Sequence, residues 1–124
     1  MFIIIILIPA IWFLFLNKGS DRELASKKLT GKWLRYDGTY MIEIQKVNPD
    51  GTLNAAYFNP NPIKVGIAQW KFKGDKLNIM VELTDKDYDG SNYLLSYDEE
   101  SGKLVGLYYQ AVAKQTYEVS FNKQ

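Results

Sequence analysis

Apolar and polar residues alternate with a period of two in short segments that cover most of the chain from Thr30 onward. Residues 39–47 show the pattern clearly, because the side chains of Tyr40, Ile42 and Ile44 fall on one face. Successive side chains of a strand point to opposite faces, so this alternation is typical of a strand with one buried face. The sequence Asn48-Pro49-Asp50-Gly51 follows and predicts a turn, since Pro presets φ and Gly accepts a positive φ.

The same reasoning predicts about eight strands. They cover residues 30–35, 39–47, 52–58, 63–72, 77–83, 93–97, 104–112 and 115–121. A bulge is expected at Gly66, and the segment 59–62 is not expected to continue a sheet, because Pro lacks the ladder N–H. The connections are short and contain no helix-length pattern, so we expect an all-β fold, an antiparallel up-and-down meander. Closure into a barrel would remove exposed edges, and a β-sandwich is the alternative.

An almost wholly apolar segment, residues 1–16, precedes this domain. As a helix, residues 2–16 would be about 23 Å long, which is shorter than the ~30 Å hydrocarbon core of a bilayer. We therefore expect an N-terminal apolar helix that is a signal peptide or a membrane anchor, either cleaved or retained. Residues 17–28 are polar and are expected to form a linker or a short helix, followed by a β-barrel domain at 29–124.

The location of the domain depends on two opposing signals. Lys18, Arg22, Lys27 and Lys28 follow the apolar segment and no basic residue precedes it, which favours a cytoplasmic domain under the positive-inside rule. A start this apolar is nevertheless typical of an export signal. We expect an extracytoplasmic domain, which is periplasmic, secreted or membrane-anchored through residues 1–16.

The chain contains no cysteine and no histidine. Disulfides, thiolate zinc sites, Cys nucleophiles, Ser-His-Asp triads and His-ligated metals are therefore excluded. Fifteen basic and fourteen acidic residues are interspersed, so no basic stripe predicts a nucleic-acid partner. Glu43, Glu82 and Glu118 lie on the polar phase of strands and do not predict a paired-carboxylate hydrolase. We expect a protein that is not an enzyme and has no cofactor.

One segment resembles the first half of a calcium-binding loop. Asp85, Asp87 and Asp89 alternate before Gly90, so three carboxylates could converge on a hard cation. The twelfth position is Ser96 where an EF-hand has Glu, which excludes an EF-hand. The alternatives are a looser calcium turn and a solvated loop in which Asp is favoured by turn geometry.

The segment Leu29-Thr30-Gly31-Lys32-Trp33 resembles the opening of the lipocalins and, more fully, that of avidin and streptavidin. Gly38-Thr39, Val47-Asn48, Gly51 and Tyr57 follow at similar spacing, with one extra residue. Gln69-Trp70-Lys71-Phe72 looks like the avidin tryptophan strand, and Tyr93-Leu94-Leu95 stands where avidins carry Trp-Leu-Leu. The resemblance is clearest over residues 29–59.

This resemblance implies a small organic ligand in a pocket at one barrel end, biotin in the avidins. Thr39 and Tyr57 would donate to the polar head of the ligand, Trp70 and Tyr93 would form apolar walls, and Trp33 would lie at the bottom. Three further contact positions differ from the family, because they carry Arg35, Asn59 and Gln115. Altered hydrogen-bonding partners reject analogues strongly, so we expect a ligand other than biotin.

Two alternatives remain open. The aromatic residues could simply fill the interior of a small barrel. The domain could also be a membrane-tethered protein-interaction module that uses the 59–62 loop or an exposed patch of Met41, Phe58, Met80 and Tyr109.

Overall fold

The computed structural model describes residues 19–124, so the predicted apolar segment 1–16 lies outside the described residues. A helix covers residues 19–29 and nine strands follow it. The strands are β1 (Gly31–Arg35), β2 (Met41–Val47), β3 (Leu53–Phe58), β4 (Pro62–Ile63), β5 (Val65–Lys73), β6 (Lys76–Leu83), β7 (Asn92–Tyr97), β8 (Leu104–Gln110) and β9 (Gln115–Lys123).

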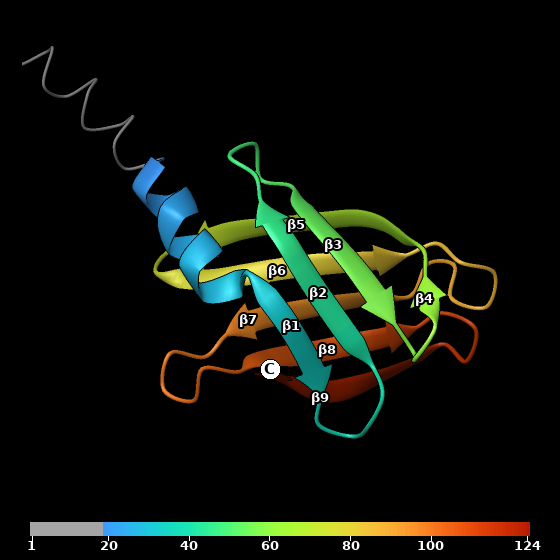
Figure 1. Cartoon of the computed structure of the whole chain (residues 1–124). Helices are drawn as coiled ribbons and strands as arrows, with labels where there is room; N and C mark the ends of the chain where they lie inside the picture. The colour runs from blue at the N-terminus through green and yellow to red at the C-terminus, as the bar shows by residue number, and fades with distance from the viewer. Residues whose placement is uncertain (1–18) are drawn as a thin grey trace, which may run out of the picture.

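All nine strands belong to one antiparallel sheet in the order β4-β3-β2-β1-β9-β8-β7-β6-β5. The sheet curls so that β1–β3 lie in front of β6–β9 (Figure 1). The N–H of Trp70 donates to the carbonyl oxygen of Gly51 over 2.9 Å, and Thr52 forms a bridge with Gln69. These contacts join the β3 and β5 sides, so the predicted all-β meander is confirmed as a nearly closed barrel.

The ninth strand is the two-residue β4, which the sequence pattern did not separate from β5. Pro62 lies in it opposite Phe58, in contrast to the expectation that residues 59–62 lie outside the sheet. β4 is an edge strand, where a residue without an N–H is tolerated. The predicted bulge is present, because the β5–β6 register shifts between Val65 and Ala68.

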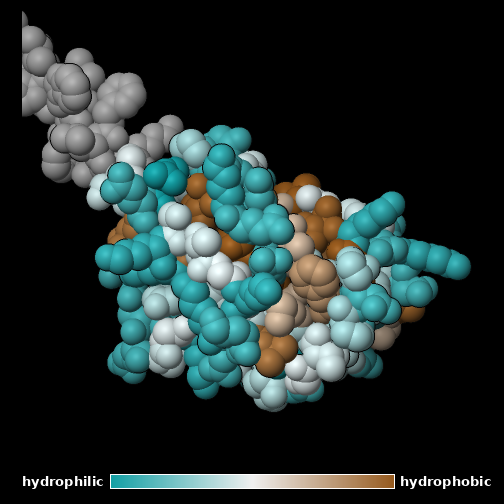
Figure 2. All heavy atoms as spheres, in the orientation of Figure 1, coloured by the Kyte–Doolittle hydropathy of each residue, from teal (hydrophilic) through white to brown (hydrophobic). Residues whose placement is uncertain are grey.

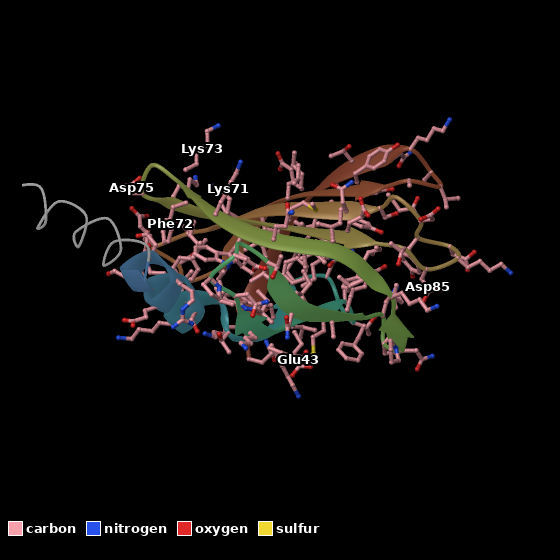
Figure 3. The ribbon with its side chains drawn as sticks, turned by 90° about the horizontal axis from the view of Figure 1, so that it is seen from above. Glu43, Lys71, Phe72, Lys73, Asp75 and Asp85 are labelled. Carbon is pink, nitrogen blue, oxygen red and sulfur yellow. The ribbon has the colours of Figure 1, made fainter. Side chains whose placement is uncertain are left out.

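Large aromatic side chains fill the interior of the barrel. The largest of them are at most 1% exposed: Trp33, Tyr57, Tyr93 and Phe121. Branched aliphatic residues from β2, β6 and β7 surround them. The alternation also holds on the outer side, where Figure 3 shows Glu43 pointing away from the barrel. Burying this apolar area is the main contribution to stability for a domain of this size.

The N-terminal helix closes one end of the barrel (Figure 1). Asp21 near its start and Lys27 and Lys28 in its last turn suit the helix dipole. Ala25 and Leu29 are fully buried, and Lys28 forms an ion pair with Glu99 in the β7–β8 loop. The sequence predicted either a linker or a short helix over residues 17–28. The structure has a helix at residues 19–29, and this helix docks on the barrel. Within residues 19–124, no helix has the length and apolar character needed to cross a bilayer.

Candidate functional site

The end of the barrel opposite the helix contains a cavity of about 730 Å³. It lies between the β1–β2, β3–β4, β6–β7 and β8–β9 connections. Its wall combines aromatic and polar side chains, which include Arg35, Asp37, Asn59, Asp87 and Gln110 and five tyrosines, Tyr36, Tyr40, Tyr88, Tyr108 and Tyr117. The volume falls in the range of about 300–1,000 Å³ that is usual for small-molecule sites.

Arg35 lies at the base of this cavity, at the end of β1, and is only 8% exposed. Its Nε and one terminal nitrogen donate to the two carboxylate oxygens of Asp37 over 2.6 and 2.8 Å. Its guanidinium carbon lies 3.6 Å from the centroid of the Tyr40 ring. The hydrogen bonds from Arg35 lower the pKa of Asp37. The charge of Arg35 is therefore balanced by Asp37 and covered by Tyr40.

A chain of hydrogen bonds leads from this pair into the core. The other terminal nitrogen of Arg35 donates to the Tyr93 hydroxyl over 2.9 Å. The hydroxyls of Tyr93 and Tyr57 share a hydrogen bond of 2.7 Å. Burial raises the pKa of both phenols well above the ordinary value, so both stay protonated at neutral pH. Every buried side-chain nitrogen and oxygen in residues 19–124 has a hydrogen-bond partner.

Three tyrosines form a stack that rises from the core to the rim. The Tyr93 and Tyr108 rings are stacked with centroids 4.4 Å apart, and Tyr117 stacks near Tyr108 at 6.4 Å. Tyr117 and Tyr108 both line the cavity. The aromatic core and the aromatic wall of the cavity are thus continuous.

Asn59 connects three of the loops around the opening. It lines the cavity, accepts a hydrogen bond from the Thr39 hydroxyl over 3.1 Å and donates to the Tyr88 hydroxyl over 2.9 Å. Of the eight predicted ligand-binding residues, Arg35 and Asn59 line the cavity. Tyr57 and Tyr93 are buried behind the lining, where they bond to each other and Tyr93 bonds to Arg35. Thr39 is exposed and bonds to Asn59.

The remaining three predicted residues lie elsewhere. Trp33 is fully buried beside the helix, where its Nε1 donates to the Leu29 carbonyl over 2.8 Å. β5 carries Trp70 toward the helix end, where its Nε1 donates to the Asn48 carbonyl over 2.8 Å. Trp70 lines a separate groove over β5–β7 instead of the cavity. Gln115 is exposed and accepts a hydrogen bond from Tyr117 over 2.7 Å.

Sequence reasoning missed several lining residues, above all Asp37, Tyr88, Tyr108 and Gln110. Tyr108 falls on the inward phase of its strand and near the end that the loops surround, so alternation combined with topology could have identified it. Asp37 and Tyr88 lie in loops, where no periodicity indicates direction. They are recognised as part of a site only when the barrel brings the loops together.

The predicted calcium segment forms a loop at the open end of the barrel, where Figure 3 shows Asp85 at the end opposite Lys73 and Asp75. The Asp85 carboxylate accepts hydrogen bonds from the backbone N–H groups of Lys64 and Lys86 over 3.1 and 2.8 Å. Those bonds lower the pKa of Asp85. Residues 19–124 contain no group of three or more acidic side chains placed to hold a metal ion. Asp87 instead lies in the wall of the cavity.

The predicted exposed patch separates into different surfaces. Met41 and Phe58 are cross-strand partners on β2 and β3, and Leu34 pairs with Met41 from β1. Figure 2 shows apolar atoms over these strands with hydrophilic atoms around them. Met80 lies on β6 beside Leu94, and Tyr109 lies between the polar partners Asn92 and Thr116. The four residues therefore do not form one patch.

The fold and the site together define a small antiparallel β-barrel that a helix closes at one end and that carries an aromatic, polar cavity at the other. No protein-family model, curated protein or solved structure matches this chain.

Proposed function

We propose that this protein is a non-catalytic barrel that binds a small ligand in the cavity at its open end. The observation that carries this proposal is the cavity itself, a space of about 730 Å³ over a buried and fully bonded polar base. A site of this kind is preorganised, because Arg35 and Tyr93 are held before any ligand arrives. Preorganisation reduces the entropy cost of binding.

The resemblance to the avidins supports a ligand site at the same end of the barrel. The altered positions Arg35 and Asn59 line this cavity, Thr39 bonds to Asn59, and Tyr57 lies buried behind the lining. Because Trp70 and Gln115 lie outside it, the ligand contacts would differ from those of an avidin. Biotin is therefore a useful test compound but not the expected ligand.

We further propose that the protein works at the cell envelope, where residues 1–16 act as a signal peptide or a membrane anchor. Cell fractionation combined with protease accessibility of the intact cells tests this location. Protection of the domain by the cytoplasmic membrane would contradict it.

A thermal-shift screen of small metabolites that includes biotin tests the binding function. We expect at least one compound to raise the melting temperature, since a ligand that binds only the native state stabilises it. The effect should disappear in Val112→Trp, because Val112 lines the cavity, is 70% exposed and tolerates a larger side chain. Ile67→Trp is the matched control, since Ile67 is 48% exposed and lies on β5 outside the cavity.

A screen in which no compound stabilises the protein would contradict the proposal. So would stabilisation that Val112→Trp leaves unchanged, because that result would place the ligand somewhere other than the cavity.

A further inference from the structure

The aromatic wall of the cavity has a definite electrostatic character. Five of its lining residues are tyrosines, of which Tyr36 and Tyr117 are 64% and 45% exposed. The face of a phenol ring carries a negative potential that attracts cations, and the attraction strengthens where several rings surround one charge. The wall therefore favours a positively charged group over a negative one.

The ionised groups at the cavity act in the same direction. Three acidic residues line it, Asp37, Asp87 and Glu118, whereas Arg35 is the one basic lining residue in the described part of the chain. Glu118 lies between the inward-facing Tyr117 and Val119 on β9, so its side chain is on the outward phase. Asp37 and Asp87 are the two lining carboxylates that come from the loops around the cavity.

Arg35 is not placed to receive an anionic ligand. Three of its five N–H donors are already used by Asp37 and Tyr93, and one face of its guanidinium is covered by Tyr40. Asp37 already balances the charge of Arg35 through a bidentate ion pair that is largely buried on the arginine side, so the pair offers little net positive charge to an anion.

Asp87, by contrast, remains available. It is exposed, and it makes no ion pair or side-chain hydrogen bond with residues 19–124. Since Arg35 and Asp37 neutralise each other, Asp87 leaves the lining of the cavity with a net negative charge. A cation that enters the cavity gains both the tyrosine faces and this carboxylate.

We propose that the ligand of this cavity is a small organic cation, an alkylammonium or arylammonium compound whose charged group lies among the tyrosine rings beside Asp87. This inference rests on the proposed binding function and adds the chemical class of the ligand. The charged group needs no deep polar partner, because cation–π contact and a nearby carboxylate stabilise it while part of it stays hydrated.

Three probes of one shape and different charge test this inference. They are choline, its neutral analogue 3,3-dimethylbutan-1-ol and the anion 3,3-dimethylbutanoate, each titrated into the ¹⁵N-labelled full chain in a neutral maltoside detergent. We expect choline to shift the backbone amide signals of Tyr88 and Gln110 and to bind at least about tenfold more tightly than either analogue. The choline affinity should fall as salt is raised, because the field of an exposed carboxylate is screened.

Matched variants separate the two contributions. Asp87→Asn should weaken choline binding about threefold to tenfold, whereas Asp75→Asn, at the helix end of the barrel, should leave it unchanged. Tyr117→Leu should weaken binding, and Tyr117→Phe, which keeps the ring, should retain it. If the Asp87→Asn variant binds choline as tightly as the parent protein does, the proposed role of Asp87 is wrong.

The outcomes distinguish this inference from the binding function on which it rests. If the alcohol or the anion binds at these signals as tightly as choline, the cation preference is wrong and the cavity is still a binding site. If none of the three probes binds but the metabolite screen yields a cavity ligand without a positive charge, the cation preference is again wrong. If neither experiment yields a ligand at the cavity, both proposals are wrong.

Discussion

Tyr93 joins the polar base of the cavity to the apolar core. Its hydroxyl accepts a hydrogen bond from Arg35 and shares another with Tyr57. Its ring stacks on Tyr108 and meets the edge of Phe121 with centroids 5.3 Å apart. Because one fully buried side chain makes all of these contacts, the position of Arg35 depends on the packing of the core.

We predict that Tyr93→Phe lowers the free energy of unfolding by about 2–3 kcal/mol, because Arg35 and Tyr57 would each lose a buried hydrogen-bond partner. Tyr57→Phe should cost about 1 kcal/mol, since Tyr93 keeps its bond from Arg35. The double variant should cost clearly less than the sum, as residues in one hydrogen-bond chain are coupled. Urea unfolding measures all three, and additive losses would contradict the hydrogen-bond chain.

The Arg35–Asp37 pair makes stability depend on pH in the acid range. The bonds from Arg35 lower the pKa of Asp37 in the folded protein, so the unfolded state binds the proton more readily. The stabilisation is present above the unfolded pKa and is lost as the pH falls through the lower folded pKa.

We therefore predict that the melting temperature of Asp37→Asn decreases less than that of the parent protein between about pH 4 and pH 2. Asp75→Asn is the matched control, because Asp75 makes no ion pair with residues 19–124 and should leave the fall unchanged. An unchanged acid profile in Asp37→Asn would show that the pair contributes nothing measurable.

At the scale of elements, the helix at 19–29 is an integral part of the barrel. Leu29 is fully buried, and its carbonyl accepts the indole N–H of Trp33, so the end of the helix and the start of β1 fix each other. The Lys123 ammonium lies 3.3 Å from the Lys28 carbonyl oxygen, which ties the last strand to the same turn. The helix therefore covers the closed end with side chains that a linker could not supply.

We predict that Leu29→Ala lowers the free energy of unfolding by about 2–4 kcal/mol, through lost burial and an unfilled space beside Trp33. Leu24→Ala should cost less than about 1 kcal/mol, since Leu24 is 42% exposed on the same helix. Urea or thermal unfolding of both variants measures the difference. Equal losses would mean that the helix does not depend on its buried face.

The strands were predictable from the sequence because alternation is a local property of the chain. All eight expected strands are present, and the bulge near Gly66 follows from a residue with no side chain at an edge. The docking of Leu29 was not predictable, since residues 17–28 are polar and their helix is anchored by a short apolar turn. The position of Trp70 was not predictable either. A period of two indicates which face of β5 carries Trp70, but it does not indicate at which end of the barrel that part of the strand lies.

At the scale of the whole molecule, the two ends of the barrel differ in chemistry. One end is closed by the helix and by Trp33, and the other holds the tyrosine-lined cavity. Residue 19, the first described residue, lies on the side of the closed end, away from the cavity (Figure 1). The cavity itself was only partly predictable, because four loops that are distant in sequence form its wall.

Binding of a small molecule inside the open end of the barrel is the proposal on which the ligand class depends. The most direct test is a ¹H–¹⁵N correlation spectrum of the full chain, recorded with the strongest compound from the metabolite screen. We predict that the shifted signals belong to Arg35, Tyr88 and Gln110 and that those of Trp33 and Trp70 stay in place. Shifts confined to the helix end or to the outer face around Met41 and Phe58 would mean that the ligand binds outside the cavity.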